Sequence, residues 1–308
     1  MLEKKHFHYL SKDGIHKIHA VLWQDTSVKT VGILQLIHGM AEYIERYDAV
    51  ASFFASKGYL VVGNDHLGHG ESVKDASELG YFSKGDSATL LVMDVANLQK
   101  VMHLQHPELP YFILGHSMGS LVLRNYLCRF GKDIDGAIIC GTTHYPQALV
   151  SIGKFITGIL KILGLQKGKY SLIDRVLFSA NNKKTEKRTK FDWLCIDETV
   201  VDTYIEDELC GFLFSVNGFD TLFELVGRLN RVAYLKCMPK ELPVLFIAGM
   251  EDPVGQYGKN IEEVAKQFKD LGMKNTKVIL YDNARHEILN EKIKQNVFED
   301  IYSWIKKG

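Results

Sequence analysis

Short, near-continuous apolar runs that alternate with amphipathic segments constrain the fold of this chain more than any other feature. Such runs are typical of strands that are covered on both faces of a sheet. They occupy residues 31–37, 59–63, 111–114, 136–140, 244–248 and 277–281. The segments between most of them place apolar side chains three and four positions apart, at residues 49–56, 88–103, 120–130 and 261–271, and this spacing predicts helices. The alternation predicts an α/β protein, with a mostly parallel central sheet flanked by helices.

The pattern departs from this alternation in two places. Near the start of the chain, residues 6–10 and 17–23 alternate apolar and polar side chains around a turn-rich quartet, Ser11 to Gly14, which predicts a hairpin. From residue 142 to residue 237 the pattern is helical or irregular, which predicts a mainly helical cap inserted over the end of the sheet. We therefore expect a first core part (1–141), the cap (142–237) and a second core part (238–308).

The predicted cap contains an amphipathic helix and a polar segment. Residues 151–165 carry one apolar helical face, formed by Ile152, Phe155, Ile156, Ile159, Leu160 and Leu163. We expect this face to pack on the core. The alternative is contact with lipid aggregates, which amphipathic helices flanked by lysine can make. Residues 181–190 are polar and basic without periodicity, which predicts a solvated loop.

Charge and cysteine content exclude several classes of protein. The 37 Lys and Arg residues balance 37 Asp and Glu residues, whereas nucleic-acid binders usually carry a basic excess. The cysteines lack any Cys-x-x-Cys pair, which argues against a disulfide framework or a zinc site; they are Cys128, Cys140, Cys195, Cys210 and Cys237. No signal peptide and no membrane-spanning apolar stretch is recognisable. These features predict a soluble, cytoplasmic protein that binds no nucleic acid.

The pentapeptide Gly115-His116-Ser117-Met118-Gly119 lies between a predicted strand and a predicted helix. A serine at such a sharp turn has a strained backbone, and glycines two positions before and after it prevent collisions. Ser117 is therefore the candidate nucleophile.

A serine nucleophile needs a base to take its proton, and the base needs a carboxylate to orient it. In this architecture the acid and then the histidine follow later strands of the sheet. Asp252 follows the strand 244–248, and His286 follows the strand 277–281. Glu251 and Asp282 are alternative carboxylates, but we expect Glu251 to point away from the site and Asp282 to form a turn.

Attack on a carbonyl creates an oxyanion, which requires preorganised donors. We expect one donor to be the Met118 amide, at the start of the helix after the nucleophile. The second should be the Met40 amide, because Gly39 lets the loop after the first buried strand turn toward Ser117. His38, His66, His69 and His116 are expected near the same edge of the sheet in supporting hydrogen bonds. No metal-ligand pattern is present among them.

Five motifs, taken in order, resemble the α/β-hydrolases grouped with monoacylglycerol lipases, bacterial lysophospholipases and the serine aminopeptidase S33 branch. They are His38-Gly39-Met40-Ala41-Glu42 with Arg46-Tyr47, Asp65-His66-Leu67-Gly68-His69-Gly70-Glu71-Ser72, Gly115-His116-Ser117-Met118-Gly119, Ala248-Gly249-Met250-Glu251-Asp252 and Ala284-Arg285-His286-Glu287. The resemblance implies an α/β-hydrolase fold and a carboxylesterase that acts on monoacylated lipids or short-to-medium acyl esters. It also implies Ser117, Asp252 and His286 as the triad, with no metal and no other cofactor.

The resemblance extends to residues around the nucleophile. By likeness to monoacylglycerol lipases, Glu42 and Arg46 would lie near the glycerol end of the pocket; the alternative is an ion pair that fixes the loop. Asp65 matches a family carboxylate that braces a turn.

Two other functions are compatible with the sequence. The same triad could cleave amides as an aminopeptidase, with the acidic residues 206–208 holding a free amino terminus; the alternative for these residues is a solvated helix start. The fold could also be retained by a non-catalytic binding protein.

Overall fold

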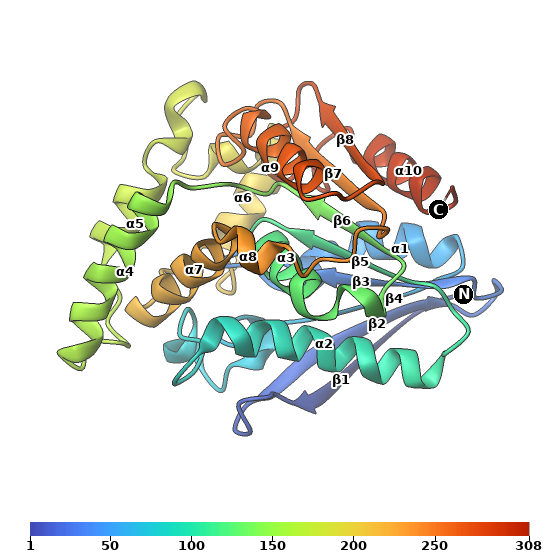
Figure 1. The fold of residues 1–308 in the computed structure, drawn as a ribbon, viewed down its shortest axis with the longest axis horizontal. Helices are drawn as coiled ribbons and strands as arrows, with labels where there is room; N and C mark the ends of the chain where they lie inside the picture. The colour runs from blue at the N-terminus through green and yellow to red at the C-terminus, as the bar shows by residue number, and fades with distance from the viewer. Residues whose placement is uncertain (308) are drawn as a thin grey trace.

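An eight-stranded sheet forms the centre of the computed structural model, which describes residues 1–307 (Figure 1). The strand order is β1-β2-β4-β3-β5-β6-β7-β8. The strands are β1 (Leu2–Leu10), β2 (Lys17–Asp25), β3 (Gly32–Ile37), β4 (Tyr59–Asn64), β5 (Tyr111–His116), β6 (Gly136–Cys140), β7 (Val244–Gly249) and β8 (Thr276–Tyr281). β2 runs antiparallel to β1 and β4, and the strands from β4 to β8 are parallel. The predicted hairpin and mostly parallel sheet are both confirmed.

The burial of the strands follows from their position in the sheet. Every residue of β3, β4, β5, β6 and β7 is buried, as their continuous apolar runs predicted. β8 was also expected to be covered on both faces, but it lies at the edge of the sheet and most of its residues are only half-buried. Its short apolar run did not distinguish an edge strand from a central one.

Helices cover both faces of the sheet and create two apolar cores. α1 (Asp48–Ser56) and α10 (Lys294–Ile305) share one core, and α2 (Ser87–Gln105), α3 (Met118–Phe130) and α9 (Lys259–Asp270) share the other. α10 was not among the predicted helices, although Val297, Phe298 and Ile301 bury its inner face. The other four match the predicted segments within a few residues.

Five helices occupy the segment between β6 and β7: α4 (Gln147–Ile162), α5 (Ser171–Phe178), α6 (Glu198–Glu206), α7 (Val216–Leu229) and α8 (Val232–Leu235). α7 joins the core of α2 and α3 through Phe219, Leu225 and Leu229. α4 and α5 lie outside α7, at the left margin of Figure 1. Within the predicted polar loop 181–190, Asn181–Lys184 form a short 3₁₀ helix.

The apolar face of α4 points away from the core, so the expectation that it packs there is wrong. The exposed fractions of Ile152, Phe155 and Ile162 are 57%, 69% and 87%. The opposite side of α4 is held by α7, because Lys161 Nζ lies 2.6 Å from Asp220 Oδ2 and the Thr157 hydroxyl donates to the same carboxylate at 2.8 Å. None of the helices in the described part of the chain combines the length and the apolar character needed to cross a membrane.

Candidate active site

Ser117 lies at the sharp turn between β5 and α3. Its backbone adopts φ 52° and ψ −118°, which a non-glycine residue rarely does. The flanking glycines are required by space: a Cβ atom on Gly115 would lie 2.5 Å from the Gly119 carbonyl oxygen, and one on Gly119 would overlap the Ile37 carbonyl oxygen of β3. Glycine at both positions therefore lets β5, α3 and β3 approach closely enough to present the serine hydroxyl.

The structure brings Ser117, His286 and Asp252 into one hydrogen-bonded chain. His286 Nε2 lies 2.8 Å from Ser117 Oγ, and His286 Nδ1 lies 3.0 Å from Asp252 Oδ2. Asp252 and His286 are buried, and each follows the carboxyl end of its strand, β7 or β8. This geometry lets the imidazole accept the serine proton while the carboxylate holds the ring orientation.

The two alternative carboxylates lie elsewhere. Glu251 faces Arg285, at 3.9 Å between the charged atoms, and is half exposed. Asp282 is exposed in the turn after β8. Neither carboxylate is hydrogen-bonded to His286 among the residues that the structure describes.

The backbone amides of Met40 and Met118 have no hydrogen-bond acceptor within residues 1–307. Met118 is the first residue of α3, where the helix dipole favours negative charge. Both residues contact the same cavity as Ser117. Two free donors beside a serine hydroxyl fit the requirements of an oxyanion site.

A buried ionic cluster joins the Met40 loop to the His286 loop. Arg46 contacts Glu42 at 2.5 Å and both carboxylate oxygens of Glu287 at 2.9 and 2.7 Å. Burial by itself would raise the pKa of Glu42, but the charge of Arg46 and the contact with His116 hold it well below its ordinary value. Glu42 also accepts a hydrogen bond from the Gly39 amide at 2.6 Å. The ion pair that the sequence offered as an alternative role for Glu42 and Arg46 is therefore present.

His116, beside the nucleophile, extends this cluster to the base. Its Nε2 lies 3.1 Å from the carbonyl oxygen of His286, and its Nδ1 faces the Tyr47 hydroxyl at 2.9 Å and Glu42 at 3.4 Å. Burial would lower the pKa of His116, but the hydrogen bond to Glu42 and the charge of Glu42 raise it above its ordinary value. Nothing in the sequence indicated that His116 contacts the His286 loop.

Three further histidines support the Met40 loop. His38 Nε2 accepts a hydrogen bond from the His66 amide at 2.9 Å, and His69 Nε2 accepts one from the Ala41 amide at 3.3 Å. Burial lowers the pKa of His66 to about 4 and that of His69 to about 3, so both rings are neutral. His66 Nε2 donates to the His38 carbonyl oxygen at 3.2 Å, whereas His69 Nε2 is an acceptor. Among residues 1–307, no group of His, Cys, Asp and Glu side chains is arranged to hold a metal ion.

The segment between β6 and β7 contacts the His286 loop through residues that sequence reasoning missed. The Trp193 ring lies 5.3 Å from the His286 ring, centroid to centroid. Arg285 donates to Glu186 at 2.8 Å and to the Asp192 carbonyl at 2.8 Å. Buried Glu291 accepts from the amides of both Arg285 and Ile196 at 2.9 Å. The only sequence feature that could have indicated these residues is that Arg285 and Glu291 lie close to His286 in the chain.

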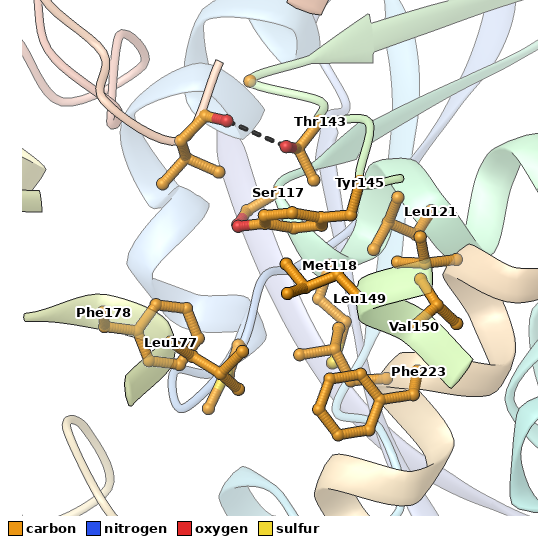
Figure 2. Close-up of a pocket in the computed structure, with 15 residues that line it drawn as sticks. Ser117, Met118, Leu121, Thr143, Tyr145, Leu149, Val150, Leu177, Phe178 and Phe223 are labelled. Carbon is orange, nitrogen blue, oxygen red and sulfur yellow. Dashed lines mark hydrogen bonds between the residues drawn. The ribbon is translucent and has the colours of Figure 1, made fainter. Parts of the chain in front are cut away.

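Two cavities meet at Ser117. The first, here called the narrow cavity, has a volume of about 70 Å³. Figure 2 shows its wall of mostly apolar side chains from α3, α4, α5 and α7, with the Thr143 hydroxyl turned away to the Val254 carbonyl at 2.8 Å. The labelled members are Ser117, Met118, Leu121, Thr143, Tyr145, Leu149, Val150, Leu177, Phe178 and Phe223.

The second, here called the wide cavity, has a volume of about 490 Å³. His286, Glu42 and Glu287 lie at its inner part together with Ser117, and charged side chains of the inserted segment also line it. Arg46 is not among its lining residues. The acidic residues 206–208 line neither cavity: they end α6 instead of starting a helix, and Asp207 accepts a hydrogen bond from the Tyr43 hydroxyl at 2.8 Å.

Comparison with known proteins gives a consistent result. Residues 28–293 match the family described as "Serine aminopeptidase, S33". A monoacylglycerol lipase of Mycolicibacterium smegmatis is 26% identical over 296 residues, which cover 95% of this chain and 93% of that protein. The monoglyceride lipase of Homo sapiens is 26% identical over 313 residues, which cover 97% of this chain and 90% of that protein.

A solved carboxyl esterase from Bacillus coagulans, in complex with glycerol, superposes with a TM-score of 0.91 at 28% identity and covers 99% of this chain and 98% of that one. The family match spans most of the chain and includes the nucleophile turn, both of its hydrogen-bonded partners and the inserted helices. The chain therefore belongs to the serine aminopeptidase S33 family of α/β-hydrolases.

Proposed function

We propose that this chain hydrolyses carboxylic esters of monoacylated lipids through an acyl-enzyme on Ser117. The observation that carries the proposal is the hydrogen-bonded chain Ser117–His286–Asp252 at the junction of a narrow apolar cavity and a wider one that also contains charged side chains. The relatives named monoacylglycerol lipase and the esterase structure support the ester class.

The reaction has two steps. His286 takes the Ser117 proton as the hydroxyl oxygen attacks the ester carbonyl, and the Met40 and Met118 amides receive the oxyanion. His286 then gives its proton to the departing alcohol, which leaves an acyl-serine. Water attacks that ester with His286 again as the base, and the fatty acid departs as Ser117 recovers its proton. Asp252 holds the imidazole and stabilises its charged form.

The inserted segment, residues 142–237, acts as the cap and presents the enzyme to lipid. The exposed face of α4 places Ile152, Phe155 and Ile159 together on the outside of the molecule. Exposed apolar patches of this kind mark interaction sites, and an amphipathic helix can insert its apolar face at a lipid interface. The occupant of this face is the surface of a lipid aggregate, from which a monoacylated lipid enters the cavities beneath α5.

A cytoplasmic location is part of the same proposal. Cys128, Cys140, Cys195 and Cys210 are buried free thiols, and Cys237 is an exposed one. Free thiols without disulfides are typical of reducing compartments.

A fluorophosphonate probe and an ester panel test the proposal. We expect the probe to label wild type on Ser117 and the enzyme to turn over p-nitrophenyl butyrate and monoacylglycerol. Ser117→Ala should lose labelling and nearly all turnover, whereas Ser151→Ala, on the exposed surface of α4, should keep both. Wild-type turnover in Ser117→Ala would refute the assignment, and a protein that neither labels nor cleaves any ester would support a binding-only role. Faster cleavage of alanine anilides than of any ester would favour an aminopeptidase.

A further inference from the structure

The two cavities differ in their position relative to the base. His286 lines the wide cavity but not the narrow one, although both contain Ser117. Since His286 must protonate the departing alcohol, the leaving group lies on the side of its Nε2 atom. The leaving group therefore occupies the wide cavity, and the carbonyl end of the acyl chain enters the narrow, apolar one.

The wide cavity is large for a glycerol leaving group. Its volume of about 490 Å³ falls within the range of roughly 300–1,000 Å³ that is typical of sites for drug-sized ligands. Glycerol would fill only a small part of this space, next to Ser117 and Glu42. The remainder extends between α5 and the segment 190–194 and calls for a larger alcohol.

The charges in this outer part favour an anion. Arg175, Lys190 and the carboxyl group of Asp174 line this part of the cavity, and neither cation forms a salt bridge among residues 1–307. Lys190 Nζ instead lies 4.6 Å from the Phe191 ring centroid. The Asp174 carboxyl group is half-buried; burial raises its pKa above the ordinary value, and the charge of Lys190 opposes that rise. Two cations therefore face one carboxylate in this part of the cavity, which leaves an excess of positive charge.

The carboxylates at the inner end do not cancel these two cations. Glu42 and Glu287 are both bound to Arg46, at 2.5 and 2.7 Å. Arg46 offsets one of these two negative charges within the buried cluster. Neither carboxylate forms a salt bridge with Arg175 or Lys190 among residues 1–307, so both cations remain available to a ligand. Guanidinium and ammonium groups are the side chains that most often bind phosphate.

We propose that the wide cavity selects leaving groups that carry a phosphodiester, so that lysophospholipids are preferred over monoacylglycerols. Arg175 and Lys190 bind the phosphodiester oxygens while the carbonyl end of the acyl chain enters the narrow cavity. This selectivity rests on the ester hydrolysis proposed above. The bond that breaks is the ester bond between the acyl carbon and the glycerol oxygen; one water is consumed, and the products are a fatty acid and an intact glycerophosphodiester.

The test compares substrates with the same acyl chain at concentrations below micelle formation. We would measure kcat/KM for decanoyl lysophosphatidylcholine, decanoyl lysophosphatidylglycerol, 1-decanoylglycerol and p-nitrophenyl butyrate. In the double variant Arg175→Gln/Lys190→Gln, kcat/KM for both lysophospholipids should fall roughly 10- to 100-fold, as expected for the loss of charge-assisted hydrogen bonds. The values for decanoylglycerol and for the p-nitrophenyl ester should stay unchanged, which also shows that the variant is folded.

The matched control removes two lysines of the inserted segment that do not line the wide cavity. Lys169→Gln/Lys183→Gln takes the same charge from exposed positions, and its kcat/KM values should equal those of wild type. An equal loss in both double variants, or an equal loss on all substrates, would overturn the proposed phosphodiester site.

Failure of this proposal is distinguishable from failure of the proposed function. If wild type cleaves decanoylglycerol but neither lysophospholipid, the headgroup selectivity is wrong and ester hydrolysis stands. If the double variant lowers kcat/KM for lysophosphatidylcholine but not for lysophosphatidylglycerol, the two cations do not bind the phosphodiester that both substrates share. The proposal is then also wrong. If wild type cleaves no ester and Ser117 takes no probe, the proposed function fails, and the headgroup selectivity fails with it.

Discussion

At the scale of the residue, Gly119 shows how little room the nucleophile turn has. A Cβ atom there would overlap the Ile37 carbonyl oxygen and lie 2.6 Å from that of His38. Gly119→Ala must push the start of α3 away from β3 and so displace the Met118 amide. We expect kcat for p-nitrophenyl butyrate to fall on the order of 100-fold, as when an oxyanion donor is lost. The control is Gly158→Ala on α4, where nothing lies within 4 Å of the added carbon; a Gly119→Ala enzyme as active as this control would contradict the steric account.

Replacing Arg46 should strongly destabilise the fold, because its side chain lies between two buried carboxylates. Arg46→Met leaves Glu42 and Glu287 unpaired, and breaking a buried ion pair in this way typically costs about 3–5 kcal/mol. Urea unfolding measures this change in the free energy of unfolding. Lys57→Met removes an exposed partner of Glu299, at 3.4 Å, and should cost no more than about 1 kcal/mol. Equal costs for the two variants would show that the Arg46 cluster adds no stability of its own.

At the scale of the element, α4 carries the proposed contact with lipid. Phe155 and Ile162 are 69% and 87% exposed, and burying such a side chain in an apolar medium is worth about 1.5–3 kcal/mol. Phe155→Glu/Ile162→Glu should therefore reduce the vesicle-bound fraction and the rate on vesicle-borne monoacylglycerol at least ~10-fold, with p-nitrophenyl butyrate turnover unchanged. Vesicle co-sedimentation measures the binding.

The control for α4 is Leu104→Glu on α2, which changes a side chain that is 71% exposed in a helix that packs on the sheet. Its vesicle binding should equal that of wild type. If Leu104→Glu weakens binding as much as the α4 variant does, the effect comes from net charge and not from the α4 face.

At the scale of the whole molecule, pH sets stability through the buried histidines. Burial lowers the pKa of His69 from 6.5 to about 3, so between these values the unfolded chain binds a proton that the folded chain does not. The contribution of neutral His69 is therefore fully present above pH 6.5 and is lost as the pH falls toward 3. Asp94, whose pKa burial raises to about 6, acts in the opposite direction, so the informative quantity is a difference between variants.

His69→Gln isolates this contribution, because the amide oxygen can still accept from the Ala41 amide but cannot be protonated. Between pH 6.5 and about 4.5, wild type should lose about 2 kcal/mol more stability than His69→Gln, because the slope approaches about 1.4 kcal/mol for each unit of pH below the unfolded pKa. Urea unfolding at several pH values measures the two slopes. The exposed His103→Gln should follow wild type; a His69→Gln slope identical to wild type would mean that His69 is protonated equally in both states.

The local sequence pattern predicts some parts of this structure well and others poorly. The strands β3 to β7 and helices α1, α2, α3 and α9 were predictable because burial on one or both faces imposes a periodicity on the side chains themselves. The positions of Ser117, Asp252 and His286 were predictable because each follows a strand, and the carboxyl ends of parallel strands meet at one edge of the sheet. These features can be predicted from neighbouring residues alone, without knowing which distant residues they contact.

Other features depend on partners that are distant in the sequence. The apolar face of α4 points outward because Lys161 and Thr157 are bound to Asp220 of α7, 59 and 63 residues away. His116 reaches His286 across 170 residues, and Arg46 reaches Glu287 across 241. Periodicity predicts that a helix has an apolar and a polar face, but it does not predict which face packs on another element. Charge content likewise does not predict which carboxylate an arginine will bind. Those choices, and with them the division into a narrow apolar cavity and a wide one lined by charged side chains, arise only when the elements pack together.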